Sequence, residues 1–492
     1  MTSPATELAR DVEWQRLDPR MLLVHPIREL LRFLPVVLGI VVAGSAADGD
    51  EPWSLIGVAF PVALGLLRYL TTRFRITGGR VELQRGLLSR HVLSTPLDRV
   101  RTVDLTSSPI HRLLGLSTVR VGTGTASKDA DDRLDLDGLP TDRARELRRE
   151  LLLRVGPDAE TEEVAADERV VVRFSPRWLA YAPFTMSGLV ITAGLFGAAA
   201  QLMNTLRLWD RLDHVPMLGP DRSWWLLGPL LLAGTVLLIS LFAVVGYAVN
   251  NWAFTVSHTR LDGSWHVRRG LLTTRETSLD DDRVHGVTVG AQLGLRLAGG
   301  RRLSAIVTGL DRRQQGAAAL VPPAPRGVVL GVAADVLGTP DPLKVPLASH
   351  GPRARRRRFV RALVPALTVA ALAIVLVVAG ESPWLLTVAV VAPVVGLGLA
   401  VDRWRALGHA VAGGWFVVRS GSLGQRRSML RSEGIIGWNL RSTWFQRRAG
   451  LTKLVATTAG GRQAYAALDV PEEDAVAAAD RAVPGLVEQF LR

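Results

Sequence analysis

The 492-residue sequence contains no cysteine, and lysine occurs only at Lys128, Lys344 and Lys453. The lack of cysteine excludes disulfides, thiol nucleophiles, iron–sulfur clusters and cysteine-based zinc sites, whatever the compartment. Charged residues make up 21% of the chain and hydrophobic residues 48%, a balance that is not typical of a cytosolic enzyme. The net charge is +14 and almost all basic residues are arginine. This excess indicates nucleic acid, anionic lipid or the cytoplasmic loops of a membrane protein.

Apolar stretches come in three close pairs along the chain. Two of them, 178–206 and 223–257, contain no Asp, Glu, Lys, Arg or His. Each exceeds the roughly 20 residues that a helix needs to cross the hydrocarbon of a membrane. The other two pairs are separated by short polar turns and comprise residues 30–47 with 52–70 and residues 362–379 with 383–401. The sequence therefore predicts six transmembrane helices in three hairpins.

Arginine placement predicts the orientation of these hairpins. Arg353 and residues 355–358 precede the fifth span, Arg403 and Arg405 follow the sixth, and the connection between the two spans carries only Glu381. Positive residues flank spans on the cytoplasmic side, so both termini and all polar regions are expected there. Residues 1–20 are polar and lack the apolar core of a signal peptide, and the first span is expected to act as its own insertion signal.

Self-comparison reveals a repeated unit. Residues 16–27, before the first hairpin, share Arg, Pro, Arg, Leu and Pro at equal spacing with residues 173–184, before the second. Residues 74–90 and 254–275 correspond after these hairpins, and residues 415–421 are a diverged third copy. Ungapped correspondence also relates Ser107, Arg112, Gly115 and Leu116 to Ser442, Arg447, Gly450 and Leu451. We expect three copies of one unit, each a hairpin followed by a polar domain.

Each polar domain has a pattern of short strands closed by a helix. Residues 80–86 and 117–122 alternate polar and apolar side chains, which is typical of half-buried strands. Helices are predicted after Pro140 and Pro471, because proline and acidic residues favour the first turn of a helix. Several strands and one C-terminal helix in about 75 residues indicate a small antiparallel barrel or sandwich.

The segments 74–77, 86–88, 96–103 and 107–119 together resemble the bacterial pleckstrin-homology-like (PH-like), membrane-flanked domain of the YdbS and YdbT type. The resemblance implies three tandem PH-like half-open barrels, each capped by a helix, and carries no known catalytic residue. The second copy departs from it at residues 280–285 and has a shortened segment before Gly294 and Leu295, and the third copy departs at residues 432–436.

The resulting domain prediction divides the whole chain. Its boundaries are 1–28 for an N-terminal segment, 29–70 for hairpin 1, 74–152 for PH-like domain 1, 153–177 for a linker, 178–249 for hairpin 2, 254–337 for PH-like domain 2, 338–358 for a basic linker, 359–402 for hairpin 3 and 408–484 for PH-like domain 3. The residues expected to carry the structural motif are Pro109, Leu114, Gly115, Leu116, Gly270, Gly294 and Gly450.

The sequence contains no recognisable catalytic or metal-binding motif. Residues 280–282 are three aspartates that could hold a divalent cation, but a solvated loop is the better interpretation. The acidic run 129–138 fails as a calcium loop, because Arg133 and Ala144 occupy ligand positions. No histidine has metal-ligand or catalytic-triad spacing, and no glycine pair forms a phosphate loop. We therefore predict no metal, no cofactor and no enzymatic activity.

Arginines of the first two polar domains are the candidate contacts for anionic lipid or for a membrane or cytoplasmic protein partner. Each basic residue near anionic lipid adds about 1 kcal/mol of attraction. The candidates are Arg85, Arg90, Arg99, Arg101, Arg112, Arg269, Arg275 and Arg283. Nucleic acid is disfavoured because no aromatic platform is interleaved with them.

These expectations define a function hypothesis and its alternatives. The chain is predicted to be a non-catalytic scaffold, or a lipid- or partner-sensing protein, of the bacterial inner membrane. The alternatives are a transporter or channel component, or a membrane enzyme without a recognisable motif. Transport pathways usually place ionisable residues within spans, and the four longest apolar stretches contain none.

Overall fold

The computed structural model describes residues 14–24, 69–77, 80–85, 91–96, 102–122, 134–153, 168–185, 224–260, 263–308 and 318–485, together with the isolated helical residues 27, 63, 66, 67, 194, 197, 201 and 204. The chain forms two compact units. The first comprises residues 1–170, 253–281 and 309–314, and the second comprises residues 171–252, 282–308 and 315–492. Residues predicted as PH-like domain 2 therefore belong to both units.

A four-stranded antiparallel sheet, in the order β1-β2-β3-β4, forms part of the first unit. Its strands are β1 (Gln15–Arg16), β2 (Arg73–Thr77), β3 (Arg80–Arg85) and β4 (His91–Pro96). The alternation predicted for residues 80–86 is confirmed, because Val81 and Leu83 of β3 are fully buried and Arg80 is exposed.

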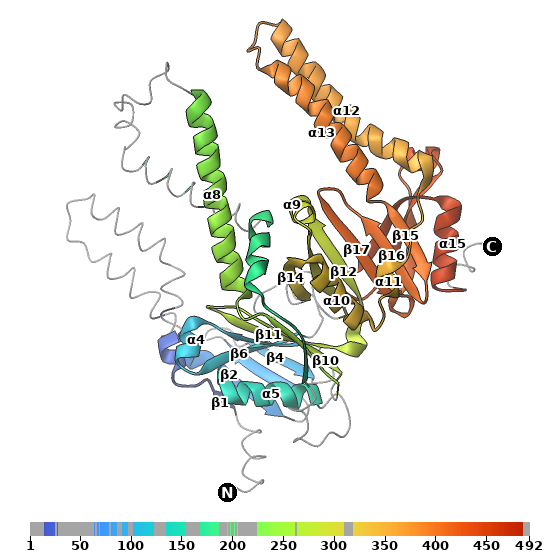
Figure 1. Ribbon diagram of the computed structural model, residues 1–492. Helices are drawn as coiled ribbons and strands as arrows, with labels where there is room; N and C mark the ends of the chain where they lie inside the picture. Colours follow the sequence, from blue (N-terminus) through green and yellow to red (C-terminus); the bar gives the residue numbers. More distant parts are fainter. Residues whose placement is uncertain are drawn as a thin grey trace. The chain divides into compact units, whose positions relative to one another are not determined.

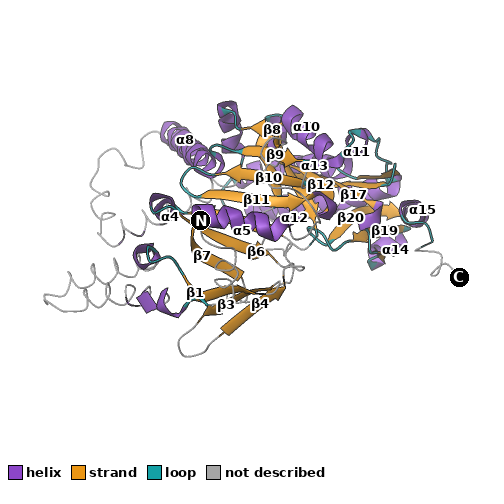
Figure 2. Ribbon diagram, turned by 90° about the horizontal axis from the view of Figure 1, so that it is seen from below, coloured by secondary structure: helices purple, strands orange, loops and turns teal. Residues whose placement is uncertain are grey.

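A seven-stranded sheet has the order β7-β6-β5-β11-β10-β9-β8, and all of it except the end of β8 belongs to the first unit (Figure 2). Its strands are β5 (Thr102–Ser107), β6 (Leu116–Gly122), β7 (Leu134–Pro140), β8 (Glu168–Arg173), β9 (Thr255–Thr259), β10 (Ser264–Arg269) and β11 (Thr274–Asp280). At the antiparallel β5–β11 pair, Ser107 lies opposite Thr274 and Asp104 opposite Thr277. The pairing satisfies backbone groups that two edge strands would leave unpaired. Strands from predicted PH-like domains 1 and 2 thus form one sheet.

The core of the first unit packs against α5 (Thr141–Leu153), and Leu116 is fully buried in it. Leu114 is only partly buried, because it is the C-cap of the short helix α4 (Pro109–Leu113), whose first residue is the predicted Pro109. Gly115 follows with φ +70°, a backbone conformation that favours glycine at a helix end. Of the two leucines in the predicted structural motif, Leu116 therefore lies in the core and Leu114 packs against it.

The second unit contains a six-stranded sheet, in the order β14-β13-β12-β17-β16-β15, and a three-stranded sheet, β18-β19-β20. The β12–β17 pair joins strands from predicted PH-like domains 2 and 3, with Val289 opposite Arg427. The strands are β12 (Val284–Gln292), β13 (Gly300–Val307), β14 (Ala319–Pro325), β15 (Gly408–Ala412), β16 (Trp415–Ser420), β17 (Gly424–Arg431), β18 (Gly437–Arg441), β19 (Leu451–Thr457) and β20 (Ala464–Pro471). The predicted C-terminal helix is α15 (Glu472–Ala482), whose buried alanines pack into the adjoining core.

The same order of elements occurs three times along the chain. Three strands are followed by a fourth strand, a five-residue helix, two more strands and a longer helix; the short helices are α4, α9 (Leu293–Leu297) and α14 (Trp444–Arg448), and the longer ones are α5, α10 (Arg326–Leu337) and α15. Gly450 follows α14 at φ +62°, as Gly115 follows α4. Gly294 does not hold this position, because it lies inside α9, and Gly299 at φ +76° holds it instead.

Three described helices are long and apolar enough to cross a membrane: residues Leu232–Asn251 of α8 (Trp224–Asn251), α12 (Gly351–Val378) and α13 (Leu385–Arg405). Figure 1 shows α12 and α13 side by side as a hairpin. The arginine run predicted as a linker forms the first turns of α12. The predicted spans 30–47 and 52–70 lie mostly outside the described residues, as does the later part of 178–206.

The start of the predicted span 178–206 is corrected by the structure. Residues Pro176–Phe184 form a 3₁₀ helix, η3, in which Trp178 and Ala182 are buried. Because this segment has a 3₁₀ rather than an α-helical backbone, the predicted α-helical span does not begin at residue 178. The apolar residues of this segment pack against neighbouring side chains. The ring of Trp178 contacts that of Phe174 edge-on, with the ring centroids 5.9 Å apart.

Candidate functional site

The arginines predicted as contacts in the first polar domain lie partly within the described residues. Arg85 ends β3 opposite His91. Arg112 is exposed on α4, and its Nη1 donates to the carbonyl oxygen of Leu271, 2.6 Å away in the same unit. Arg90, Arg99 and Arg101 lie outside the described residues. Of this group, Arg112 is the one whose side-chain contacts are described, and it links α4 to the turn after β10.

The arginines predicted in the second polar domain fall into different parts of the molecule. Arg269 and Arg275 are partners in the β10–β11 hairpin, and Gly270 begins its turn at φ +113°. A side chain at Gly270 would collide with the carbonyl oxygen of Thr273. Arg283 ends the 3₁₀ turn η5 (Asp281–Arg283) and belongs to the second compact unit. The predicted arginines therefore do not form one cluster within the described residues.

A different group of arginines lines a cavity of about 290 Å³ in the second unit. This arginine pocket contains Arg296, Arg301, Arg326, Arg419, Arg426 and Arg427. Its apolar wall is formed by Val289, Ala291, Leu330 and Leu343, and Gln425 completes the lining. None of these six arginines was among the predicted contacts. The pocket is therefore a candidate site that the sequence did not predict.

Strand register brings the pocket residues together. Val289 on β12 lies opposite Arg427 on β17, which lies opposite Arg419 on β16. Directly opposed residues project from the same face of a sheet, so these side chains form one row. Arg296 is added from the end of α9 and Arg326 from the start of α10.

Backbone carbonyl oxygens hold several of these guanidinium groups in place. Arg427 Nη2 donates to the carbonyl oxygens of Pro342 and Val345, at 3.0 and 2.9 Å. Arg419 Nη2 donates to the carbonyl oxygen of Arg405, 2.8 Å away at the end of α13. Carbonyl acceptors fix the orientation of a guanidinium group and leave its positive charge uncompensated.

Burial and repulsion between arginines lower the pKa of four of these residues. For Arg301, Arg419 and Arg427, burial is the larger cause, and other pocket arginines add to it. For Arg426, burial is again the larger cause, and the added repulsion comes from Arg302 and Arg462, which do not line the pocket. Arg296 contributes to the lowered pKa of both Arg301 and Arg419. Arginine stays protonated at neutral pH, so these positive charges remain and repel one another.

A second arginine cluster in the same unit is neutralised. Asp469 is 1% exposed and its Oδ1 accepts from Arg357 Nη1 at 3.0 Å and Gln446 Nε2 at 2.7 Å. Its Oδ2 forms an ion pair with Arg358 Nη2, 2.7 Å away. We call these four residues the Asp469 cluster. Arg357 and Arg358 lie in the first turns of α12, Asp469 in β20 and Gln446 in α14. The cluster therefore fixes the start of a candidate span to the sheet domain.

A buried histidine pair lies beside this cluster. His350 Nδ1 donates to the carbonyl oxygen of Leu468 at 2.9 Å, and its Nε2 lies 3.0 Å from His409 Nδ1. Because the carbonyl can only accept, a neutral His350 presents Nε2 as the acceptor for His409. Burial lowers the pKa of both rings, and that of His409 falls to about 4. Both rings are therefore neutral at neutral pH.

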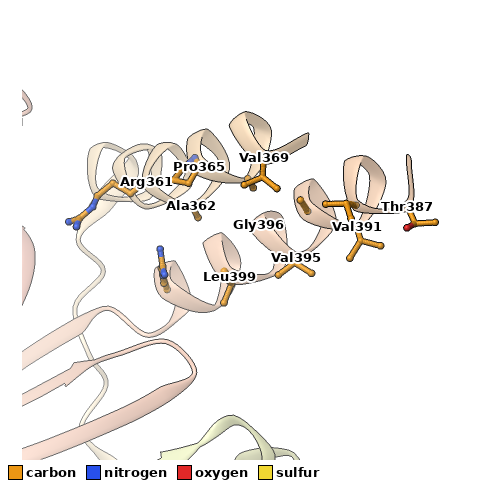
Figure 3. A pocket seen from close by; sticks show the side chains of 13 residues that line it. Arg361, Ala362, Pro365, Val369, Thr387, Val391, Val395, Gly396 and Leu399 are labelled. Atoms are coloured by element: carbon orange, nitrogen blue, oxygen red, sulfur yellow. The ribbon is translucent and has the colours of Figure 1, made fainter. Parts of the chain in front are cut away.

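The α12–α13 hairpin carries an apolar groove with a basic end (Figure 3). The groove has a volume of about 560 Å³, and Val369, Val391 and Leu399 are among its lining residues. Arg361 near the start of α12 and Arg403 near the end of α13 complete the lining. Gly396 allows close approach of the helices, since a Cβ there would lie 2.6 Å from that of Ala366.

Two regions of the chain match the sequence model of the bacterial PH domain, residues 29–155 and 361–481, together just over half of the chain. The chain belongs to the bacterial PH domain family. Each matched region begins in a predicted hairpin and runs through the strands and the closing helix. Neither a curated protein nor a solved structure matches the chain. The YdbS and YdbT type stays a prediction.

The arginine pocket lies where the C-terminal bacterial PH domain pairs with the strands that precede its hairpin. Arg419, Arg426 and Arg427 belong to the matched region 361–481. The other three arginines come from residues 284–337, which the family match does not include. The pocket is thus built jointly by this bacterial PH domain and its neighbour in the sequence.

The sequence holds a partial signal for this pocket. Arg301 with Arg302, and Arg426 with Arg427, are adjacent pairs inside strands, where side chains alternate between the two faces. The register puts Arg427 on the same face as Val289, and Arg302 and Arg426 on the other. The pairing of β12 with β17 places these faces in one sheet. That pairing joins residues far apart in the sequence across two predicted domains, and local patterns do not report it.

Proposed function

We propose that this bacterial PH protein is a non-catalytic, multi-pass protein of the inner membrane that displays three PH-like domains on the cytoplasmic face. There the domains bind anionic lipid headgroups or a protein partner. Two matched bacterial PH domains and three helices long enough to cross a membrane support this function. The recurrent element order supports counting residues 254–337 as a third, diverged PH-like domain.

The Asp469 cluster is the observation that carries the proposal. It ties the arginine-bearing start of α12 to β20 through two ion pairs with a buried carboxylate. Arginine beside a span favours the cytoplasmic side. A hairpin that inserts with this polarity therefore holds its PH-like domain at the cytoplasmic surface, where anionic headgroups are within reach.

Single cysteines test the orientation without background, because the chain has none. Ser382→Cys lies in the exposed connection between α12 and α13, and Ala477→Cys lies on the exposed side of α15. In intact cells, an impermeant maleimide should label Ser382→Cys and spare Ala477→Cys, and both should react after permeabilisation. Labelling of Ala477→Cys in intact cells would overturn the cytoplasmic placement.

Retained lipid tests the binding partner. The full chain, extracted in a mild non-ionic detergent, should carry phosphatidylglycerol or cardiolipin in excess of their share in the membrane, as measured by native mass spectrometry. Charge attraction predicts that added salt lowers this excess. If the bound lipid matches the composition of the membrane, selective binding of anionic lipid is excluded. The proposed partner is then a protein, which cross-linking in the membrane would capture.

A further inference from the structure

The arginine pocket holds more positive charge than the protein neutralises. Six arginines line it, and Asp402 is the carboxylate that pairs with one of them, Arg296, at 2.9 Å. Within the part of the chain that the structure describes, none of the other five forms an ion pair with a carboxylate. By contrast, Arg357 and Arg358 share the carboxylate of Asp469.

Such a cluster is costly when it has no ligand. Arg419 and Arg427 are direct cross-strand partners, an arrangement in which like charges destabilise a sheet. Partial burial strengthens their repulsion, because the interior screens charge less than water does. Local features that oppose stability are concentrated at functional sites, where a ligand compensates for them.

We propose that the arginine pocket binds an anion that carries two or more phosphate groups. Guanidinium groups match phosphate oxygens in geometry and form paired, charge-assisted hydrogen bonds with them. A singly charged anion would offset one of several unpaired guanidinium groups, whereas a diphosphate offsets more of them. The apolar wall of Val289, Leu330 and Leu343 suits the carbon portion of a phosphate ester.

Size and position narrow the ligand further. A cavity of about 290 Å³ is at the lower limit of small-molecule sites and suits a headgroup or small polyphosphate rather than a whole lipid. The pocket adjoins the last turns of α13, since Asp402 contacts Arg296 and Gln425, and Arg405 contacts Arg419. A soluble phosphate ester and a lipid headgroup with two phosphates therefore share the required chemistry. The inference rests on the proposed function only for the lipid source.

The test uses the full chain in non-ionic detergent and inorganic pyrophosphate as the probe, with titration calorimetry as the readout. The wild type should bind pyrophosphate saturably, more tightly than inorganic phosphate, and with an affinity that falls as salt rises. Arg301→Gln and Arg326→Gln should each weaken binding at least about tenfold, the loss expected for one hydrogen-bonded charge. Arg441→Gln and Arg448→Gln, exposed arginines of the same unit, serve as matched controls and should bind as the wild type does.

A melting measurement separates loss of binding from loss of fold. Removing Arg301 or Arg326 relieves the repulsion between these two arginines, so each variant should melt, without ligand, at or above the wild-type temperature. Pyrophosphate should raise the melting temperature of the wild type and of the controls, but not of the pocket variants. Variants that melt lower and lose binding together would assign these arginines a structural role and overturn the proposal.

Competition identifies the source of the phosphate groups. Displacement of pyrophosphate by cardiolipin in nanodiscs, but not by phosphatidylcholine, supports a lipid headgroup. Binding that cardiolipin leaves unchanged supports a soluble polyphosphate ester; the pocket proposal then stands, while lipid sensing at this pocket does not. Absence of pyrophosphate binding, or equal losses in pocket and control variants, overturns the pocket proposal, and retention of anionic lipid by the chain would still support the proposed function.

Discussion

The arginine pocket and the Asp469 cluster are two arginine-rich regions of one compact unit with opposite electrostatics. In the Asp469 cluster, two arginines of α12 share a carboxylate that is 1% exposed. In the arginine pocket, six arginines line a cavity, and among the described residues Asp402 is the one carboxylate that forms an ion pair with any of them. The first arrangement is electrically satisfied within the protein, and the second is not.

This difference teaches how to distinguish structural from functional arginines in a chain whose basic residues are almost all arginine. The presence of several arginines does not by itself distinguish the two regions, because both are rich in arginine. The deciding feature is whether a partner within the fold neutralises the charge. Asp469 is a partner of that kind, and its buried ion pairs hold a helix to a sheet. The pocket lacks one, and the neutralising charge must come from outside.

The largest expected effect follows removal of the carboxylate in the Asp469 cluster. Asp469→Asn keeps the shape of the side chain and tolerates the observed φ of +56°, but leaves Arg357 and Arg358 buried without a counter-charge. We expect the free energy of unfolding to fall by about 3–5 kcal/mol. Denaturant unfolding in detergent, followed by tryptophan fluorescence, measures it. The control Asp474→Asn removes an exposed carboxylate of α15 and should change stability little. Equal losses in both variants would contradict a structural role specific to Asp469.

Local patterns in the sequence predicted those parts of the fold that local physics determines. Residues 362–379 and 383–401 are apolar throughout and became α12 and α13, and the alternation in residues 117–122 became β6. The buried Leu116 and the turn at Gly115 also follow from neighbouring residues. Each of these features depends on residues close together in the sequence, or on an apolar segment long enough to cross a membrane.

Long-range pairing determined what the sequence did not predict. The β5–β11 and β12–β17 pairs join strands of different predicted domains. They divide residues 254–337 between two compact units. The arginine pocket depends on the second of these pairs, and the Asp469 cluster depends on contacts from α12 to β20. The sequence shows where the arginines are, but only the pairing of distant strands shows which of them lack a counter-charge.

A pH effect of intermediate size is expected beside the Asp469 cluster. His409 has a pKa of about 4 in the folded protein, because of burial and then the charge of His350, against 6.5 when unfolded. The unfolded chain therefore binds more protons between these values, so stability is complete above pH 6.5 and falls as pH drops toward 4. The loss should approach about 3 kcal/mol, at 1.36 kcal/mol per pKa unit. Unfolding at a series of pH values measures it, and His409→Gln should flatten the slope. An unchanged slope in that variant would show that the effect does not come from His409.

The smallest change in stability is expected from removing Asp402, the carboxylate beside the arginine pocket. This variant gives the most direct comparison with removal of Asp469. Asp402→Asn breaks the ion pair with Arg296, in which the two side chains are 19% and 21% exposed. It also removes a negative charge from the C-terminal turn of α13, where the helix dipole disfavours it. These effects oppose each other, so the free energy of unfolding should fall by only about 1–2 kcal/mol, less than for Asp469→Asn.

Pyrophosphate binding should respond to Asp402→Asn in the opposite direction to the arginine variants. Arg296 becomes available to the ligand and a repelling carboxylate is lost, so affinity should rise about threefold to tenfold in titration calorimetry. Glu472→Gln, which removes an exposed carboxylate from α15, is the matched control and should leave the affinity unchanged. Weaker binding in Asp402→Asn would mean that the carboxylate positions Arg296 for the ligand. The pocket would then resemble the Asp469 cluster, in which a carboxylate organises arginines, and its distinction as a region of uncompensated charge would be lost.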